Sequence, residues 1–103
     1  MATYVLMTKL TPAALQGTSG RRATGHDWKK KVEVVCPGLR WIAHYALLGQ
    51  YDFMDVYEAP DGETAFRVSL LSREYGALTA ESWPAVAYPE FLGIADAVEG
   101  RPA

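Results

Sequence analysis

The chain has 103 residues, half of them apolar, and its formal net charge is −2. This length predicts a single domain over residues 1–103, and the composition is that of an ordinary soluble globular protein. A nucleic-acid surface needs an excess of basic residues that is absent here, and no apolar run approaches the roughly 20 residues of a membrane span. The only cysteine, Cys36, cannot form an intramolecular disulfide, which favours the reducing cytoplasm.

Apolar periodicity and turn residues predict the elements of secondary structure along the chain. In chain order, we expect a strand over 3–9, a short helical turn begun by Thr11 and Pro12, a mobile loop over 17–25, a helix closed by Cys36-Pro37-Gly38, strands over 39–48 and 51–58, a helix from Asp61 to Gly76, a strand over 77–87 and a last helix opened by Pro89. Gly49-Gln50 has the composition of a two-residue type II′ turn, because Gly occupies the position that needs a positive φ. This turn pairs the two central strands so that the numbers of opposed residues sum to 99.

The predicted order is β-α-β-β-α-β with one more helix at the C-terminal end. This is the ferredoxin-like α+β order, built on an antiparallel sheet. Helices in this topology cover one face of the sheet, yet apolar residues alternate onto both faces. In the strand after the turn, one face carries Tyr51, Phe53 and Tyr57, and the other carries Met54 and Val56. Because an uncovered apolar face marks an interface, we expect a homodimer or a multiple of one, burying more than about 1,200 Å² in total.

The stretch from Leu48 to Asp61 resembles the GYD family, small proteins in which a Gly-x-Tyr-Asp turn runs into Glu-Ala-Pro-Asp. The matching residues here are Gly49, Tyr51, Asp52, Glu58, Ala59, Pro60 and Asp61. The resemblance runs from about Leu47 to Phe91 and includes the first strand. It implies a dimeric α+β barrel, a superfamily that also holds small monooxygenases, isomerases and ligand-binding regulatory domains. It carries no agreed catalytic residues, so it assigns no residue a role.

One pair of residues in the predicted hairpin has the chemistry of a general base. In the register set by the turn, His44 lies opposite Asp55 on the same face, with Cβ atoms about 5 Å apart. At that distance Asp55 can hold the imidazole by a hydrogen bond and favour its charged form. The alternative interpretation is a cross-strand polar pair that satisfies itself at the dimer seam. A three-residue turn would dissolve the pair, because His44 would then face Val56.

Aromatic side chains of the strands form a second candidate site, for an apolar or aromatic molecule held between sheet and helices. The candidate ligand-binding residues are Trp41, Tyr45, Tyr51, Phe53, Tyr57 and Trp83. The structural alternative is that they are core residues, as strand aromatics commonly are. The two histidines, His26 and His44, lack metal-ligand spacing, and the sequence has no phosphate loop or dinucleotide fingerprint. We therefore expect neither a metal nor a cofactor.

Three functions stay open at this point. The first is a homodimeric module that binds a small apolar or aromatic molecule. The second is a cofactor-free monooxygenase or isomerase with the His44–Asp55 pair as general base. The third is a non-catalytic structural or accessory oligomer. A molecule bound in a pocket separates the first two from the third, and a His44→Ala variant that binds without turnover separates the second from the first.

Overall fold

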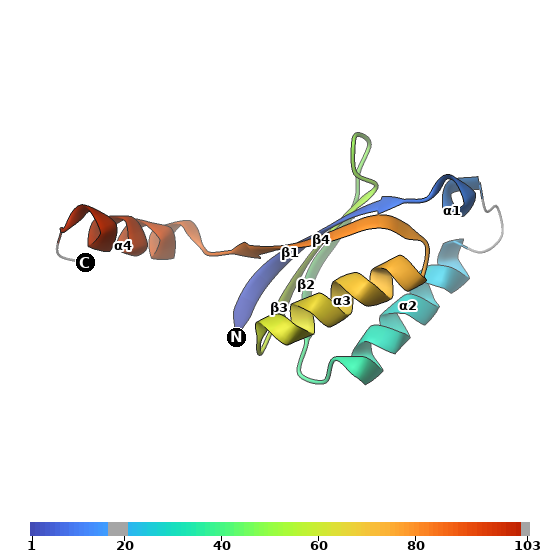
Figure 1. Cartoon of the computed structure of the whole chain (residues 1–103), viewed down its shortest axis with the longest axis horizontal. Coiled ribbons are helices and arrows are strands. Elements are labelled where there is room, and N and C mark those ends of the chain that lie inside the picture. The colour runs from blue at the N-terminus through green and yellow to red at the C-terminus, as the bar shows by residue number, and fades with distance from the viewer. Residues whose placement is uncertain (17–20, 102–103) are drawn as a thin grey trace.

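The computed structural model describes residues 1–16 and 21–101. Its elements, in chain order, are β1 (Ala2–Leu10), α1 (Pro12–Gln16), α2 (Arg21–Val35), β2 (Arg40–Ala46), β3 (Phe53–Ala59), α3 (Gly62–Glu74), β4 (Ala77–Ala85) and α4 (Tyr88–Glu99) (Figure 1). None of the helices in these two ranges has the length and apolar content that crossing a membrane requires.

The four strands form one antiparallel sheet in the order β2-β3-β1-β4. Helices α2 and α3 lie side by side over one face of this sheet (Figure 1). The arrangement confirms the predicted α+β fold. Pro84 lies in β4, which is an edge strand, and an edge is where a strand tolerates the missing amide of proline.

The core lies between the sheet and the two helices that cover it. Its largest fully buried side chains are Leu6, Val32, Cys36, Tyr57 and Val68. The Tyr57 hydroxyl donates a hydrogen bond to Ser82 Oγ at 2.8 Å, and burial raises the pKa of Tyr57 to about 12. Burial also raises the pKa of the Cys36 thiol, so this thiol stays protonated and packs as a small apolar side chain.

The β2–β3 hairpin has the predicted register near its tip. His44 pairs with Asp55 and Ala46 with Phe53, and the Leu47 amide extends the register by donating to the Asp52 carbonyl at 2.8 Å. The strands nevertheless stop at Ala46 and resume at Phe53, so the predicted ends at residues 48 and 51 were wrong. The predicted type II′ turn at Gly49-Gln50 was wrong as well, because Gly49 does not have the positive φ that this turn requires.

Asp52 is the last residue beside the turn that is held on both sides. Its amide donates to the Thr8 carbonyl of β1 at 2.8 Å, and its carbonyl accepts from the Leu47 amide at 2.8 Å. On the other side of the turn, Leu48 is fully exposed, so no packing holds it in a strand.

A β-bulge at Ile42 changes the pairing in the other half of the hairpin. Trp41 pairs with Tyr57, whereas a constant sum of 99 places Ile42 there, so the predicted register was wrong at this point. The extra residue turns Trp41 toward the helix-covered face, where its ring lies 6.0 Å from Tyr57 and 5.3 Å from Trp28 of α2. Ile42 is left half exposed.

Helix α2 begins earlier than the sequence predicted. The predicted loop over 17–25 was wrong for residues 21–25, which are helical, and residues 17–20 lie outside the described residues. A single glycine inside a helix costs only about 1 kcal/mol relative to alanine, so Gly25 does not stop this one. The predicted starts of α1 and α3 are confirmed by helix-capping hydrogen bonds. Thr11 Oγ1 accepts from the Ala14 amide at 3.1 Å, and the Asp61 carboxylate accepts from the Thr64 amide at 2.8 Å.

The face of the sheet opposite α2 and α3, called here the open face, is largely apolar, although it also carries Glu58 and Glu81. By strand alternation it carries Val5, Met7, Ala43, Tyr45, Met54, Val56 and Trp83. None of the described helices covers this face (Figure 1).

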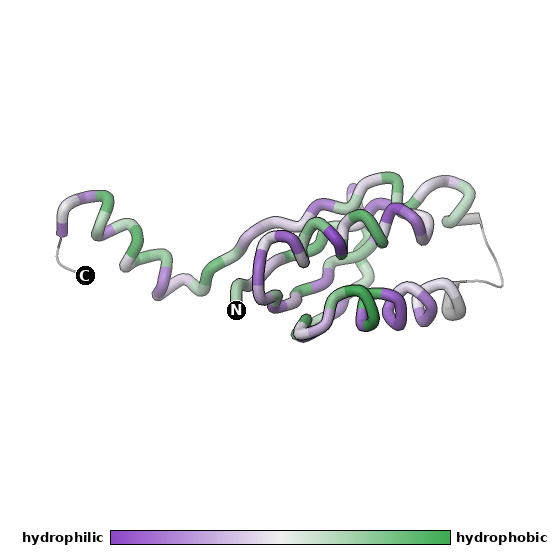
Figure 2. The backbone as a smooth tube through the Cα atoms, turned by 60° about the horizontal axis from the view of Figure 1, so that its bottom comes forward, coloured by the Kyte–Doolittle hydropathy of each residue, from purple (hydrophilic) through white to green (hydrophobic). Residues whose placement is uncertain are grey.

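Helix α4 extends away from the sheet and from the other helices (Figure 1, Figure 2). None of its residues is buried, although Phe91, Leu92 and Ile94 are large and apolar. The Cα radius of gyration is 15.9 Å, against about 13 Å for a compact domain of 100 residues. A single chain therefore leaves two apolar surfaces uncovered, the open face and α4.

Candidate functional site

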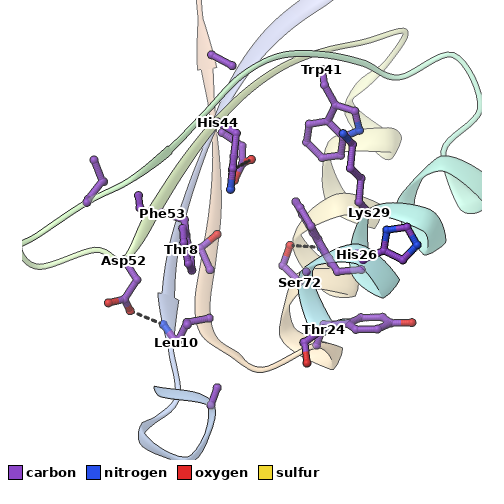
Figure 3. Close-up of a pocket in the computed structure, with 18 of the residues that line it drawn as sticks. Thr8, Leu10, Thr24, His26, Lys29, Trp41, His44, Asp52, Phe53 and Ser72 are labelled. Carbon is purple, nitrogen blue, oxygen red and sulfur yellow. Dashed lines mark hydrogen bonds and ion pairs between the residues drawn. The ribbon is translucent and has the colours of Figure 1, made fainter. Parts of the chain in front are cut away.

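A cavity of about 760 Å³ lies between the sheet and α2 (Figure 3). Its walls come from β2, β3, the end of β1 and the facing sides of α2 and α3. The residues used below are Trp28, Lys29, Trp41, His44, Phe53 and Asp55. Because α2 packs against α3, space remains between α2 and the edge strand β2.

His44 and Asp55 meet on the cavity wall, as the register predicted. His44 Nδ1 and Asp55 Oδ1 form a hydrogen bond. The Asp55 side chain is buried, whereas that of His44 is 60% exposed and stacks on Phe53 with ring centroids 5.7 Å apart. Since Nδ1 is held by Asp55, the other ring nitrogen, Nε2, is the one that a molecule in the cavity can reach. An imidazole oriented in this way by a buried carboxylate has the geometry of a general base.

The electrostatics of the pair extend to α2. Burial raises the pKa of Asp55, and the neighbouring His44 and Lys29 act in the opposite direction. Lys29 extends from α2 toward Trp41 on the β2 side of the cavity (Figure 3). The cavity thus has a positive charge on its helix side and a buried carboxylate on its sheet side.

Two tryptophans make the apolar wall, and their indole nitrogens differ. Trp28 Nε1 donates to Ser72 Oγ at 3.0 Å, and Ser72 in turn donates to the Val68 carbonyl at 2.8 Å. Trp41 Nε1 is buried and has no hydrogen-bond partner among the described residues.

The structure divides the candidate ligand-binding residues among three places. Trp41 and Phe53 line the cavity, whereas Tyr57 is fully buried in the core. Tyr45 lies half exposed on the open face. The remaining two, Tyr51 and Trp83, stand edge to face at 6.0 Å and both donate to the Glu81 carboxylate, at 3.2 and 2.9 Å. Trp83 and Glu81 belong to the open face, so the prediction that Tyr51 shares a face with Phe53 and Tyr57 was wrong.

Sequence reasoning placed the site between sheet and helices but named none of the α2 and α3 residues that line the cavity. Trp28 was not among the predicted site residues, and nothing in the sequence indicated that Lys29 would face β2. Ser72, the acceptor for Trp28, lies 44 residues away in the sequence. The helical spacing of Trp28, Val32 and Val35 was the available signal, because it shows which side of α2 faces the sheet.

Asp52, the acidic residue of the Gly-x-Tyr-Asp motif, lies at the end of the cavity near β1. Its carboxylate accepts a hydrogen bond from the Leu10 amide at 2.8 Å. In the described part of the chain, no group of three or more His, Cys, Asp or Glu side chains is arranged to hold a metal ion.

Comparison with known proteins gives a family and a fold. A search of the curated proteins finds no match. A solved structure titled "crystal structure of FFRP-DM1" has a TM-score of 0.55 and 11% sequence identity, over 84% of this chain and 100% of that one, so it is similar in fold. The family model of the GYD domain matches residues 4–95, and the chain therefore belongs to the GYD domain family.

Proposed function

We propose that this protein binds a small, mostly apolar or aromatic molecule in the cavity between the sheet and α2. The observation that carries the proposal is the cavity itself. Its volume of about 760 Å³ lies within the roughly 300–1,000 Å³ of small-molecule sites. The indoles of Trp28 and Trp41 and the ring of Phe53 supply flat apolar walls, and the His44–Asp55 pair supplies a fixed polar group for orientation.

The same proposal includes a homodimer, or a multiple of one, in the cytoplasm. Its support is the open face, where Tyr45 is 55% and Trp83 43% exposed. A second copy of the chain can cover this face, because a two-fold interface uses the same patch on both subunits. In velocity ultracentrifugation at micromolar concentration we expect a dimer, and a Tyr45→Glu variant should shift toward monomer. A monodisperse wild-type monomer would end this part of the proposal.

Helix α4 also supports the dimer. An isolated helix shorter than about 12–15 residues is marginally stable in water, and α4 has 12 residues without one buried side chain. Its apolar side chains need a covering surface that this chain does not supply. In a symmetric dimer, each copy can supply a covering surface for the α4 helix of the other.

Binding is tested by titrating the protein with indole, a neutral aromatic probe, while the ring resonances of His44 and the indole resonance of Trp41 are followed by NMR. We expect both to shift with saturation. Ala46→Trp should abolish these shifts, because Ala46 lines the cavity. The control is Val34→Trp, a 77% exposed position on α2 that does not line the cavity. If indole leaves the resonances unmoved, or binds Ala46→Trp as well as wild type, the cavity is not the site.

The second candidate function is a cofactor-free monooxygenase or isomerase. The observation that favours it is the hydrogen bond between His44 and the buried Asp55, which orients the imidazole for proton transfer. A His44→Ala variant that retains the natural ligand and turns nothing over would support catalysis. Native mass spectrometry of freshly purified protein supplies the starting point, because it reports a retained molecule and the oligomer together. Protein that neither retains nor binds any small molecule fits the third reading, a structural oligomer.

A further inference from the structure

The β-bulge at Ile42 places a hydrogen-bond donor in the cavity wall without an acceptor. In a regular strand Trp41 would point to the open face, and the extra residue turns it toward α2 instead. There, Trp41 Nε1 is buried and unpartnered among the described residues. A buried donor without an acceptor destabilises the fold, so an acceptor brought by a bound molecule would gain binding free energy by pairing with it.

A second donor approaches the same place from the helix side. The Lys29 side chain and the Trp41 indole extend toward one another in Figure 3. None of the ion pairs between described residues involves Lys29. An ammonium group donates and never accepts, so Lys29 cannot satisfy Trp41. Two donors therefore converge on one region of the cavity.

Three acceptors that line the cavity already hold a hydrogen bond from another group. The Asp55 carboxylate binds His44, and the Asp52 carboxylate binds the Leu10 amide. Ser72 accepts from Trp28 and donates within α3. None of these groups, nor any other described residue, accepts a hydrogen bond from Trp41 Nε1, so an oxygen of a bound molecule can take that place.

We infer that the ligand carries a carbonyl or carboxylate oxygen that accepts hydrogen bonds from Trp41 Nε1 and Lys29 Nζ, on an aromatic body that packs against the walls. This inference rests on the proposed binding function and narrows its ligand class. Lys29 is the flexible member of the pair, and its side chain moves aside to let the oxygen reach the indole N–H. The body of the ligand then extends toward Phe53 and His44.

Three probes of similar size separate the possibilities: ethylbenzene has no acceptor, acetophenone has a carbonyl and benzoate has a carboxylate. We expect acetophenone to bind about tenfold more tightly than ethylbenzene, the scale of one buried donor regaining its partner. The Trp41 indole N–H resonance should move downfield with acetophenone and benzoate, as a newly hydrogen-bonded proton does, and that of Trp28 should not. This readout needs no variant and so does not depend on how any variant folds.

Matched variants then assign the donors. Trp41→Phe should remove the preference for acetophenone over ethylbenzene, whereas Trp28→Phe should keep it, because Trp28 already has a partner in Ser72. Lys29→Met should weaken benzoate more than acetophenone, and Lys30→Met should change neither, because Lys30 does not line this cavity.

The outcomes distinguish this inference from the proposed function. If all three probes bind equally, or if Trp28→Phe and Trp41→Phe behave alike, the cavity binds ligands and the inference about the oxygen is wrong. If none of the three binds, the binding function fails and the inference fails with it.

Discussion

The Asp52 carboxylate accepts a hydrogen bond from the Leu10 amide at 2.8 Å, across 42 residues of sequence. The Asp52 amide also donates to the Thr8 carbonyl of β1. Through these two bonds, the acidic residue of the Gly-x-Tyr-Asp motif ties the β2–β3 hairpin to the end of the first strand. The carboxylate of Asp52 therefore has a structural role, as the acceptor that holds the Leu10 amide.

Replacing Asp52 should destabilise the fold. Asp52→Ala leaves the partly buried Leu10 amide without its acceptor, so we expect the free energy of unfolding in urea to fall by about 1–2 kcal/mol. Asp52→Asn should lose less, since its amide oxygen still accepts. Equal stability of wild type and Asp52→Ala would show that water replaces the carboxylate without cost.

The sequence was sufficient to predict the fold class and the His44–Asp55 pair, because both depend on local signals. Gly49 marked where the chain reverses, although not the type of turn, and period-2 alternation then placed His44 opposite Asp55. The bulge at Ile42 had no such signal, since nothing in the composition of residues 40–43 marks an extra residue. Its consequence was large, because it moved Trp41 to the helix-covered face.

The rest of the candidate site depends on contacts between elements far apart in the sequence. Tyr57 and Phe53 lie on the same face of one strand, yet Tyr57 is buried in the core and Phe53 lines the cavity. How far α2 covers the sheet decides which of the two side chains is buried and which lines the cavity. That boundary is set by the packing of α2 on α3, and no short-range pattern encodes it.

Gly76 should resist substitution. It ends α3 with φ +105°, and a Cβ there would lie 3.2 Å from the Ala14 side chain. Gly76→Ala therefore combines an unfavourable backbone conformation with a close contact, and we expect a loss of roughly 1–2 kcal/mol in the free energy of unfolding. Gly25→Ala is the control, because it is helical and has open space, so it should leave stability equal or slightly higher. Similar losses at both positions would contradict the argument.

The burial of Asp55 predicts a pH dependence of stability. Its pKa is raised in the folded protein, so the folded state favours the protonated carboxyl. That contribution is full below the unfolded value of about 3.9 and is lost as pH rises through the folded pKa. The measurement is best made in a His44→Gln background, which removes the imidazole titration. There, the stability of the protein with Asp55 should fall relative to Asp55→Asn as pH increases from 4. A rise over the same range would mean that hydrogen bonding to the carboxylate outweighs its burial.

The last prediction concerns α4, whose Phe91 is 49% exposed in a single chain. If a second copy covers α4, a charge at Phe91 must be buried in the dimer and not in the monomer. Phe91→Glu should therefore shift sedimentation toward monomer and speed amide exchange over residues 88–99, while exchange in β1 and β3 stays slow. Phe66→Glu is the matched control, because Phe66 is 73% exposed on α3 and the proposed interface does not need it. In the wild type, exchange over 88–99 should quicken on dilution, since a helix of this length loses its stability with its partner. A Phe91→Glu protein that sediments as wild type, with unchanged exchange in α4, would show that the second copy leaves this helix uncovered.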